Sequence, residues 1–374
     1  MVHSGFSLTL ARYAGRRFTL TTFLTLLALT GLISLFDFID LLRRAAAHPE
    51  TGLAHVLEIT ALHVPYYVIY ILPFAVLLGG VICFSRLARS SELVVTRAAG
   101  ISAWQVLVSP CLCAALMGMT VSTGLSPLSS FCYRQAVQMD RTWLQGRHTP
   151  DDTSFSDLWI RDVGQTPSGH GGDTILHLGS LRQQGTTLKG QDITIFQLDG
   201  SMALLRRMEA RTGVLSGRVW RLRDVLILSG GRHPYRQDEL CLPSEFTTET
   251  LRMRTLPADT LSFWALPGVI KLLRHSGFST IPYRLHFQGL LALPMLAVTM
   301  TLVSAGFSMR PAGRGGIMRM LAVGVTAGFA LFAVSKIAEQ LGKSGALPPF
   351  PAAWGPAGAG LCLAAALLLH LEDG

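Results

Sequence analysis

Charged residues are scarce in this sequence, because they make up only 15% of its 374 residues. A soluble globular domain carries about 25% charged residues. The charged side chains that are present gather between residues 140 and 255, and the long tracts on either side are nearly free of them. The shortage excludes an ordinary soluble protein. Its distribution predicts a membrane protein with one water-exposed insertion.

Catalytic and cofactor-binding patterns are also missing. The sequence has no Gly-x-x-x-x-Gly-Lys-Ser/Thr loop, and residues 342–344 (GKS) lack the preceding glycine and fall on a loop expected outside the cytoplasm. His48, His55 and His63 are scattered on an outer loop and at a helix entrance, which favours structural or interfacial roles. We therefore expect no catalytic residue, no metal site and no cofactor, with any ATP hydrolysed by a partner.

Cysteine patterns typical of zinc sites and disulfide frameworks are absent as well. The sequence contains six cysteines and no Cys-x-x-Cys spacing. The closest pair, Cys111 and Cys113, lies in an apolar stretch that offers no histidine or carboxylate ligand nearby. We expect these side chains to serve in apolar packing.

Long apolar runs are the dominant positive feature. A membrane-spanning helix needs about 20 mostly apolar residues. Six segments meet or approach this length: Phe18–Leu42, His63–Phe84, Ile101–Leu125, Leu285–Met309, Met318–Gln340 and Ala352–Leu371. The first is longer than the apolar core of a signal peptide, about 7–15 residues, so we expect it to be a retained span.

Basic residues in the short loops predict the orientation of these spans, because such residues collect on the cytoplasmic side. One side has Arg12, Arg16, Arg17, Arg86, Arg89, Arg97, Arg310, Arg314 and Arg319. The other has Arg43, Arg44 and Lys343, with Lys336 nearby inside the fifth segment. We expect both termini in the cytoplasm and the insertion outside it. The net charge of +9 then reflects helix orientation and not a nucleic-acid partner.

The insertion changes to a pattern typical of β structure. Short alternating or β-rich runs occur at Ser154–Arg161, Thr174–Leu181, Gln191–Leu198, Met202–Ala210 and Arg218–Leu228. Several strands without a helical pattern between them predict a sandwich or jelly roll. A short amphipathic helix, Leu261–His275, is expected to follow. The predicted division is residues 1–129 for three helices, 130–260 for the β domain, and 261–374 for the linker helix and three further helices.

The loop between the second and third segments has the signals of a short helix. Ser90 or Ser91 can cap its start, Glu92 favours its positive end, Arg97 favours its negative end, and Gly100 can end it. Two interpretations stay open. The helix is either a simple connector or a coupling helix that docks into a cytoplasmic ATPase.

Two stretches carry a resemblance to a known family. Residues 91–95 (SELVV), followed by Ala99-Gly100, are similar to the coupling segment of the lipopolysaccharide-export permeases of the LptF/LptG type. Residues 36–45 (FDFIDLLRRA), at the end of the first span, are similar to that family too. The layout of three helices, a β domain and three helices also matches, so the resemblance covers nearly the whole chain. Both motifs are closer to the G-type subunit (LptG) than to the F-type.

The resemblance implies a six-helix membrane bundle with an inserted periplasmic all-β jelly-roll domain in the bacterial inner membrane. It implies a permease subunit of an ABC transporter that extracts lipopolysaccharide and passes it towards the outer membrane. The implied partners are a second, LptF-type permease, an LptB-type ATPase dimer, a single-span LptC-type subunit and an LptA-type periplasmic bridge. The alternative is a membrane-anchored scaffold or sensor whose β domain binds a partner protein.

The family also suggests functional residues. Arg43, Arg44 and Arg134 match basic positions that contact the substrate, and a guanidinium group can donate two parallel hydrogen bonds to a phosphate. Asp40 is expected to organise the two neighbouring arginines. The alternative is that Arg43 and Arg44 pair with Asp40 and extend to the lipid headgroups without binding substrate. The expected contacts with the ATPase are Arg89, Ser91, Glu92, Leu93 and Val94.

Overall fold

The structure is a computed structural model that divides into a helical unit and a β unit. The described residues are 8–47, 52–90, 102–144, 154–162, 174–184, 187–199, 203–229, 233–244, 257–275, 279–308 and 317–372. The helical unit contains both ends of the chain and the segment Ala258–Leu266. The β unit covers Val137–Pro257 and Pro267–Thr280.

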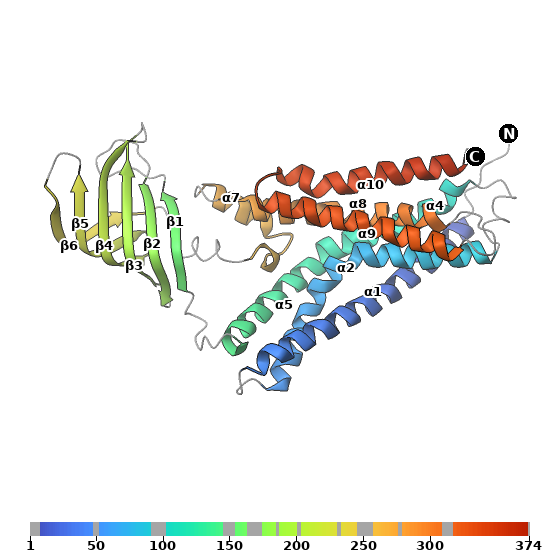
Figure 1. Ribbon diagram of the computed structural model, residues 1–374, viewed down its shortest axis with the longest axis horizontal. Helices are drawn as coiled ribbons and strands as arrows, with labels where there is room; N and C mark the ends of the chain where they lie inside the picture. Colours follow the sequence, from blue (N-terminus) through green and yellow to red (C-terminus); the bar gives the residue numbers. More distant parts are fainter. Residues whose placement is uncertain are drawn as a thin grey trace. The chain divides into compact units, whose positions relative to one another are not determined.

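Long helices form the first unit (Figure 1). They are α1 (Leu8–Ala45), α2 (Leu53–Arg89), α4 (Ala103–Thr120), α5 (Ser126–Met139), α8 (Ile281–Ser308), α9 (Ile317–Lys343) and α10 (Pro349–Glu372). Helices α4 and α5 are joined by a π-helical turn, η1 (Val121–Leu125), and a second such turn, η2 (Asp140–Leu144), follows α5. Within the described residues, six helical stretches are long and apolar enough to cross a membrane, which confirms the six predicted spans.

The third span is longer than the sequence predicts. It runs from Trp104 to Met139, whereas the apolar run ends near Leu125. The π turn lets the helix continue past Pro127, whose ring nitrogen cannot donate the usual backbone hydrogen bond. The polar residues beyond this turn therefore stay helical, although their composition alone is not that of a span.

Close backbone contacts hold the bundle together. A Cβ atom added to Gly79 of α2 would lie 2.5 Å from the Thr22 Cα of α1, and one on Gly118 of α4 would lie 2.6 Å from the Pro294 Cα of α8. Such glycines allow helices to approach closely, which is how membrane helices gain packing energy without a hydrophobic driving force. A cluster of buried apolar residues from α1, α2, α4, α8 and α10 fills the space between them.

The β unit contains one six-stranded antiparallel sheet whose strands pair in sequence order. Its strands are β1 (Ser154–Asp162), β2 (Thr174–Gln184), β3 (Thr187–Leu198), β4 (Leu204–Ser216), β5 (Val219–Ser229) and β6 (Tyr235–Pro243). An inserted β domain is confirmed, although the β unit also includes most of helix α7 (Leu266–His275). Among the described strands the order is that of a meander, without the Greek-key crossing that the name jelly roll implies.

The sequence analysis predicts the first five strands and misses β6. This strand lies at an edge of the sheet, and most of its residues are exposed, with Leu242 buried. An edge strand needs few apolar side chains, so β6 does not show the alternation that marks the others. Helix α7 (Leu266–His275) begins later than predicted, one residue before Pro267, a residue type suited to a first helical turn. A short 3₁₀ helix, η3 (Ala258–Thr260), precedes it.

Candidate functional site

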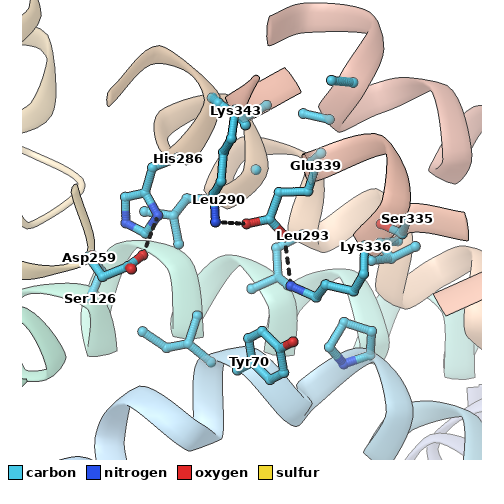
Figure 2. Close-up of a pocket in the computed structure, with 18 of the residues that line it drawn as sticks. Tyr70, Ser126, Asp259, His286, Leu290, Leu293, Ser335, Lys336, Glu339 and Lys343 are labelled. Atoms are coloured by element: carbon cyan, nitrogen blue, oxygen red, sulfur yellow. Dashed lines mark hydrogen bonds and ion pairs between the residues drawn. The ribbon is translucent and has the colours of Figure 1, made fainter. Parts of the chain in front are cut away.

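A pocket of about 360 Å³ lies inside the helical unit, between α2, α5, α8, α9, α10 and η3 (Figure 2). Its lining combines an apolar part with a charged part. The larger apolar side chains are Ile69, Pro73, Leu261, Leu285, Leu290, Leu293, Leu296 and Phe332. The ionisable ones are Tyr66, Tyr70, Asp259, His286, Lys336, Glu339 and Lys343. Ionisable groups within membrane spans are costly, so their concentration around one pocket marks a candidate functional site.

Helix α9 supplies a charged triplet to this pocket. Lys336, Glu339 and Lys343 are three and four residues apart, a spacing that places them on one helical face. The Lys336 Nζ lies 2.8 Å from Glu339 Oε2, and the Lys343 Nζ lies 2.9 Å from Glu339 Oε1. One carboxylate therefore pairs with two ammonium groups, and the triplet carries one net positive charge.

An aromatic ring supports the first of these lysines. The Lys336 Nζ lies 3.9 Å from the centre of the Tyr70 ring of α2, within the range of a cation–π interaction. The Phe332 ring, one turn earlier on α9, stands edge-on to Tyr70 at 6.1 Å between centroids. The Lys336 ammonium is thus held by a carboxylate of its own helix and by a ring from α2.

A second ion pair faces the triplet across the pocket. The Nδ1 atom of His286 on α8 lies 3.3 Å from Asp259 Oδ1 on η3. Figure 2 shows this pair on one side of the pocket and the Lys343–Glu339–Lys336 chain on the other. Positively and negatively charged side chains therefore converge on one pocket that is otherwise apolar. This arrangement suits an amphipathic ligand.

A row of aromatic rings leads from the pocket towards the end of α1. Tyr66 stacks on Tyr70 at 6.3 Å and on Tyr133 of α5 at 4.6 Å. The Tyr133 ring in turn lies 5.6 Å from His63. These contacts join rings of α2 and α5 in one continuous row.

Beyond this row, Asp37 joins α1 to α2. Its Oδ1 atom accepts a 2.8 Å hydrogen bond from the Tyr67 hydroxyl, and its Oδ2 atom lies 2.9 Å from His63 Nδ1. Both the His63 and the Asp37 side chains are only 15% exposed. The His63 imidazole therefore has the structural role that the sequence analysis favours.

The residues predicted to bind substrate occupy two places. At the end of α1, Asp40 forms an ion pair with Arg44, four residues later, and both side chains are about half exposed. Arg43 is exposed, and no ion pair or hydrogen bond involves it in the described part of the chain. Asp40 therefore organises one of the two arginines, not both.

Arg134, on α5, is used differently. Its guanidinium group donates a 3.2 Å hydrogen bond to the Thr260 carbonyl of η3. No hydrogen bond or ion pair between described residues links it to Arg43, Arg44 or Asp40. The structure thus gives Arg134 a role in holding η3 beside α5, and leaves the α1 residues as a separate group.

Four of the five predicted ATPase contacts lie outside the described residues. These four are Ser91, Glu92, Leu93 and Val94. Arg89 is the last residue of α2, and it is exposed.

The sequence analysis did not assign a functional role to the pocket residues Asp259, His286, Lys336, Glu339 and Lys343. A signal for three of them was present, because α9 places ionisable residues at helical spacing inside an apolar segment. His286 and Asp259 are 27 residues apart along the chain, and nothing local indicates that they meet.

Comparisons with known proteins point in one direction. A sequence profile described as "Lipopolysaccharide export system permease LptF/LptG" matches residues 12–370. The "Lipopolysaccharide export system permease protein LptG" of Escherichia coli K12 is 24% identical over 359 residues, which is 91% of this chain and 92% of that protein. The protein of the same name from Haemophilus influenzae is 24% identical over 363 residues, 93% of each chain.

Proposed function

The chain belongs to the lipopolysaccharide export system permease LptF/LptG family, and on this basis we propose that it is the G-type permease subunit of an ABC transporter. In this proposal the transporter extracts lipopolysaccharide from the inner membrane and passes it to a periplasmic bridge. The observation that carries the proposal is the family match along nearly the whole chain, combined with six spans around one inserted β sheet.

The proposed orientation places both termini in the cytoplasm and the β unit in the periplasm. It rests on the basic residues of the short loops, including Arg86 and Arg89 at the end of α2. In this orientation the pocket and the end of α1 face the outer leaflet, where the substrate headgroup would lie.

The proposed substrate site combines charge with apolar surface. Arg43 and Arg44, exposed at the end of α1, would donate hydrogen bonds to phosphates of the lipid headgroup. Arg134 would contribute from α5 if its bond to Thr260 opens when substrate enters. The pocket beneath, with one net positive charge on its α9 wall, would receive an anionic group and part of an acyl chain.

Energy must come from a partner in this mechanism. Each methylene of an acyl chain exposed to water costs about 0.8 kcal/mol, so passive release of a lipid with several chains is negligible. We propose that an ATPase dimer closes when it binds ATP. Its contacts on this chain would be Arg89, Ser91, Glu92, Leu93 and Val94. The movement would narrow the chamber between this chain and a second permease.

Reconstitution tests the proposal. The chain would be co-expressed with an F-type permease and the cytoplasmic ATPase, extracted in mild detergent and placed in nanodiscs. We expect one complex whose ATPase rate rises when lipopolysaccharide is added. A chain that purifies without an ATPase, or a complex that never responds to lipopolysaccharide, would instead indicate a scaffold or sensor.

A further inference from the structure

The face of the sheet opposite its hydrophobic core carries a group of partly exposed rings. Trp159 of β1 is 52% exposed, and its ring lies 4.4 Å from that of His177, its cross-strand partner on β2. The Phe196 ring of β3 lies 6.3 Å from Trp159 and within 11° of parallel to it. We call Trp159, His177 and Phe196 the aromatic platform.

The platform is not part of the packed interior. Its strand neighbours point to the other face, where Leu176, Leu178, Ile193 and Ile195 are at most 5% exposed. Cross-strand ring contacts of this kind stabilise a sheet. The Trp159 side chain nevertheless stays 52% exposed, so part of its ring surface is open to a ligand.

A hollow of about 420 Å³ lies directly beside the platform and shares His177 with it. Its polar lining consists of Asp192, Thr194, Glu209, Arg211, Asp224 and Arg236. Asp224 is paired with Arg236 at 2.8 Å, and Glu209 is paired with Arg207 beside Phe196. These pairs hold carboxylate and guanidinium groups in place at the surface.

The backbone of the sheet is distorted along this hollow. The paired registers of all five ladders skip one row, which runs through Asp157, Gly179, Asp192, Arg211, Asp224 and Asp238. In this row Asp192 and Asp224 have φ values of 54° and 55°, a left-handed conformation that is uncommon for residues other than glycine. Such irregularities in sheets re-aim side chains and occur beside binding sites.

The charges of the hollow indicate the chemistry of its ligand. The hollow is lined by the acidic residues 192, 209 and 224 and by the arginines 211 and 236, and Arg207 beside it pairs with Glu209, so the surface has no excess positive charge to attract a polyanion. It has instead many fixed donors and acceptors, which suit hydroxyl groups. The negative face of an aromatic ring also attracts the C–H groups on one side of a pyranose ring.

We propose that the aromatic platform and the adjoining hollow form a saccharide-binding site. A pyranose ring stacks on Trp159, and its hydroxyl groups bond to the carboxylates and guanidinium groups beside His177. The assignment of the occupant rests on the proposed function, because the sugar portion of a lipopolysaccharide remains in water while its acyl chains need an apolar path. The site therefore holds the saccharide of the cargo during passage along the β unit.

Calorimetric titration of the full-length protein in nanodiscs tests this site. The probe is core oligosaccharide freed of lipid A and of phosphate groups, so neither lipid nor anion binding contributes. We expect Trp159→Ala to weaken binding about tenfold and Trp159→Phe, which keeps a ring, to weaken it less. The matched control is Tyr235→Ala, which removes another aromatic side chain that is 50% exposed on the same sheet.

Three results would overturn the proposal. These are absent binding to the unmodified protein, equal binding by Trp159→Ala, and an equal loss in the Tyr235→Ala control. A parallel titration with an N-acetylglucosamine tetramer tests the source of the sugar, and a preference for this cell-wall type of glycan would overturn the assignment to the cargo. The proposed transport function is measured separately, as ATPase stimulation of the unmodified assembled complex by lipopolysaccharide that lacks core sugars.

Discussion

The indole N–H of Trp264 donates a 3.2 Å hydrogen bond to the carbonyl oxygen of Thr123. Thr123 is the residue whose carbonyl would receive the backbone N–H of position 127 in a regular α-helix, and Pro127 has none to give. A side chain more than 100 residues away thus supplies a donor where the third span passes through its π turn. The adjoining Phe263 N–H donates to the Ser126 hydroxyl at 2.9 Å, which fastens the same segment a second time.

A double-mutant cycle tests the role of Trp264. We expect Trp264→Phe to lower the free energy of unfolding by about 0.5–1.5 kcal/mol, the usual contribution of one hydrogen bond. In a Pro127→Ala background, where a backbone donor is restored, the same substitution should cost less. The measurement is the melting temperature of the detergent-solubilised protein. Strictly additive effects would show that the indole does not replace the missing donor.

The charged triplet of α9 gives a second prediction. Glu339→Gln leaves Lys336 and Lys343 facing each other without a carboxylate, so we expect a loss of about 1–2 kcal/mol in stability. This is below the roughly 3–5 kcal/mol of a fully buried pair, because these side chains are about one-third exposed or more. Lys336→Met in the same background should recover part of the loss, since it removes one unpaired charge. Gln340→Ala, on the neighbouring position, is the control and should melt like the unmodified protein.

Substitution of Asp37 should destabilise the protein much more than substitution of Asp40, although the two residues lie one turn apart on α1. Asp37→Ala removes the hydrogen-bond partner of both His63 and Tyr67, and we expect it to destabilise the protein by about 1–3 kcal/mol. Asp40→Ala breaks only an exposed ion pair with Arg44 and should cost under about 1 kcal/mol. Thermal unfolding of the two variants side by side decides the point. Equal losses in the free energy of unfolding would show that the Asp37 hydrogen bonds between α1 and α2 stabilise the protein no more than an exposed ion pair does.

Charge reversal at the end of α1 tests the proposed headgroup contact. Arg43→Glu with Arg44→Glu should lower lipopolysaccharide-stimulated ATPase activity of the complex about tenfold or more, because two charge-assisted bonds are replaced by repulsion. ATPase activity without lipid should not change. Arg218→Glu with Arg221→Glu, at two exposed positions of the β unit, makes the same change in net charge and is the control. Full stimulation of the double variant would exclude these arginines as phosphate ligands.

The number and placement of the main elements could be read from the chain. Apolar length decides which segments can span a membrane, and alternation decides which can form half-buried strands, and both are local properties. These properties located all six spans and the strands from β1 to β5. They failed where a local rule does not apply, at the π turn beside Pro127 and at the exposed edge strand β6.

The candidate site could be predicted from the sequence to a much smaller extent. Asp37 and Asp40 lie three residues apart on α1, yet Asp37 bonds to α2 and Asp40 stays about half exposed, because only Asp37 faces the next helix. The amino-acid sequence by itself determined a six-span bundle with an inserted sheet, and it determined the family to which the protein belongs. Tertiary packing alone decided that His286 meets Asp259 and that Lys336 lies over Tyr70. Such pairs depend on which helical faces meet, and periodicity within one helix does not specify the face of another.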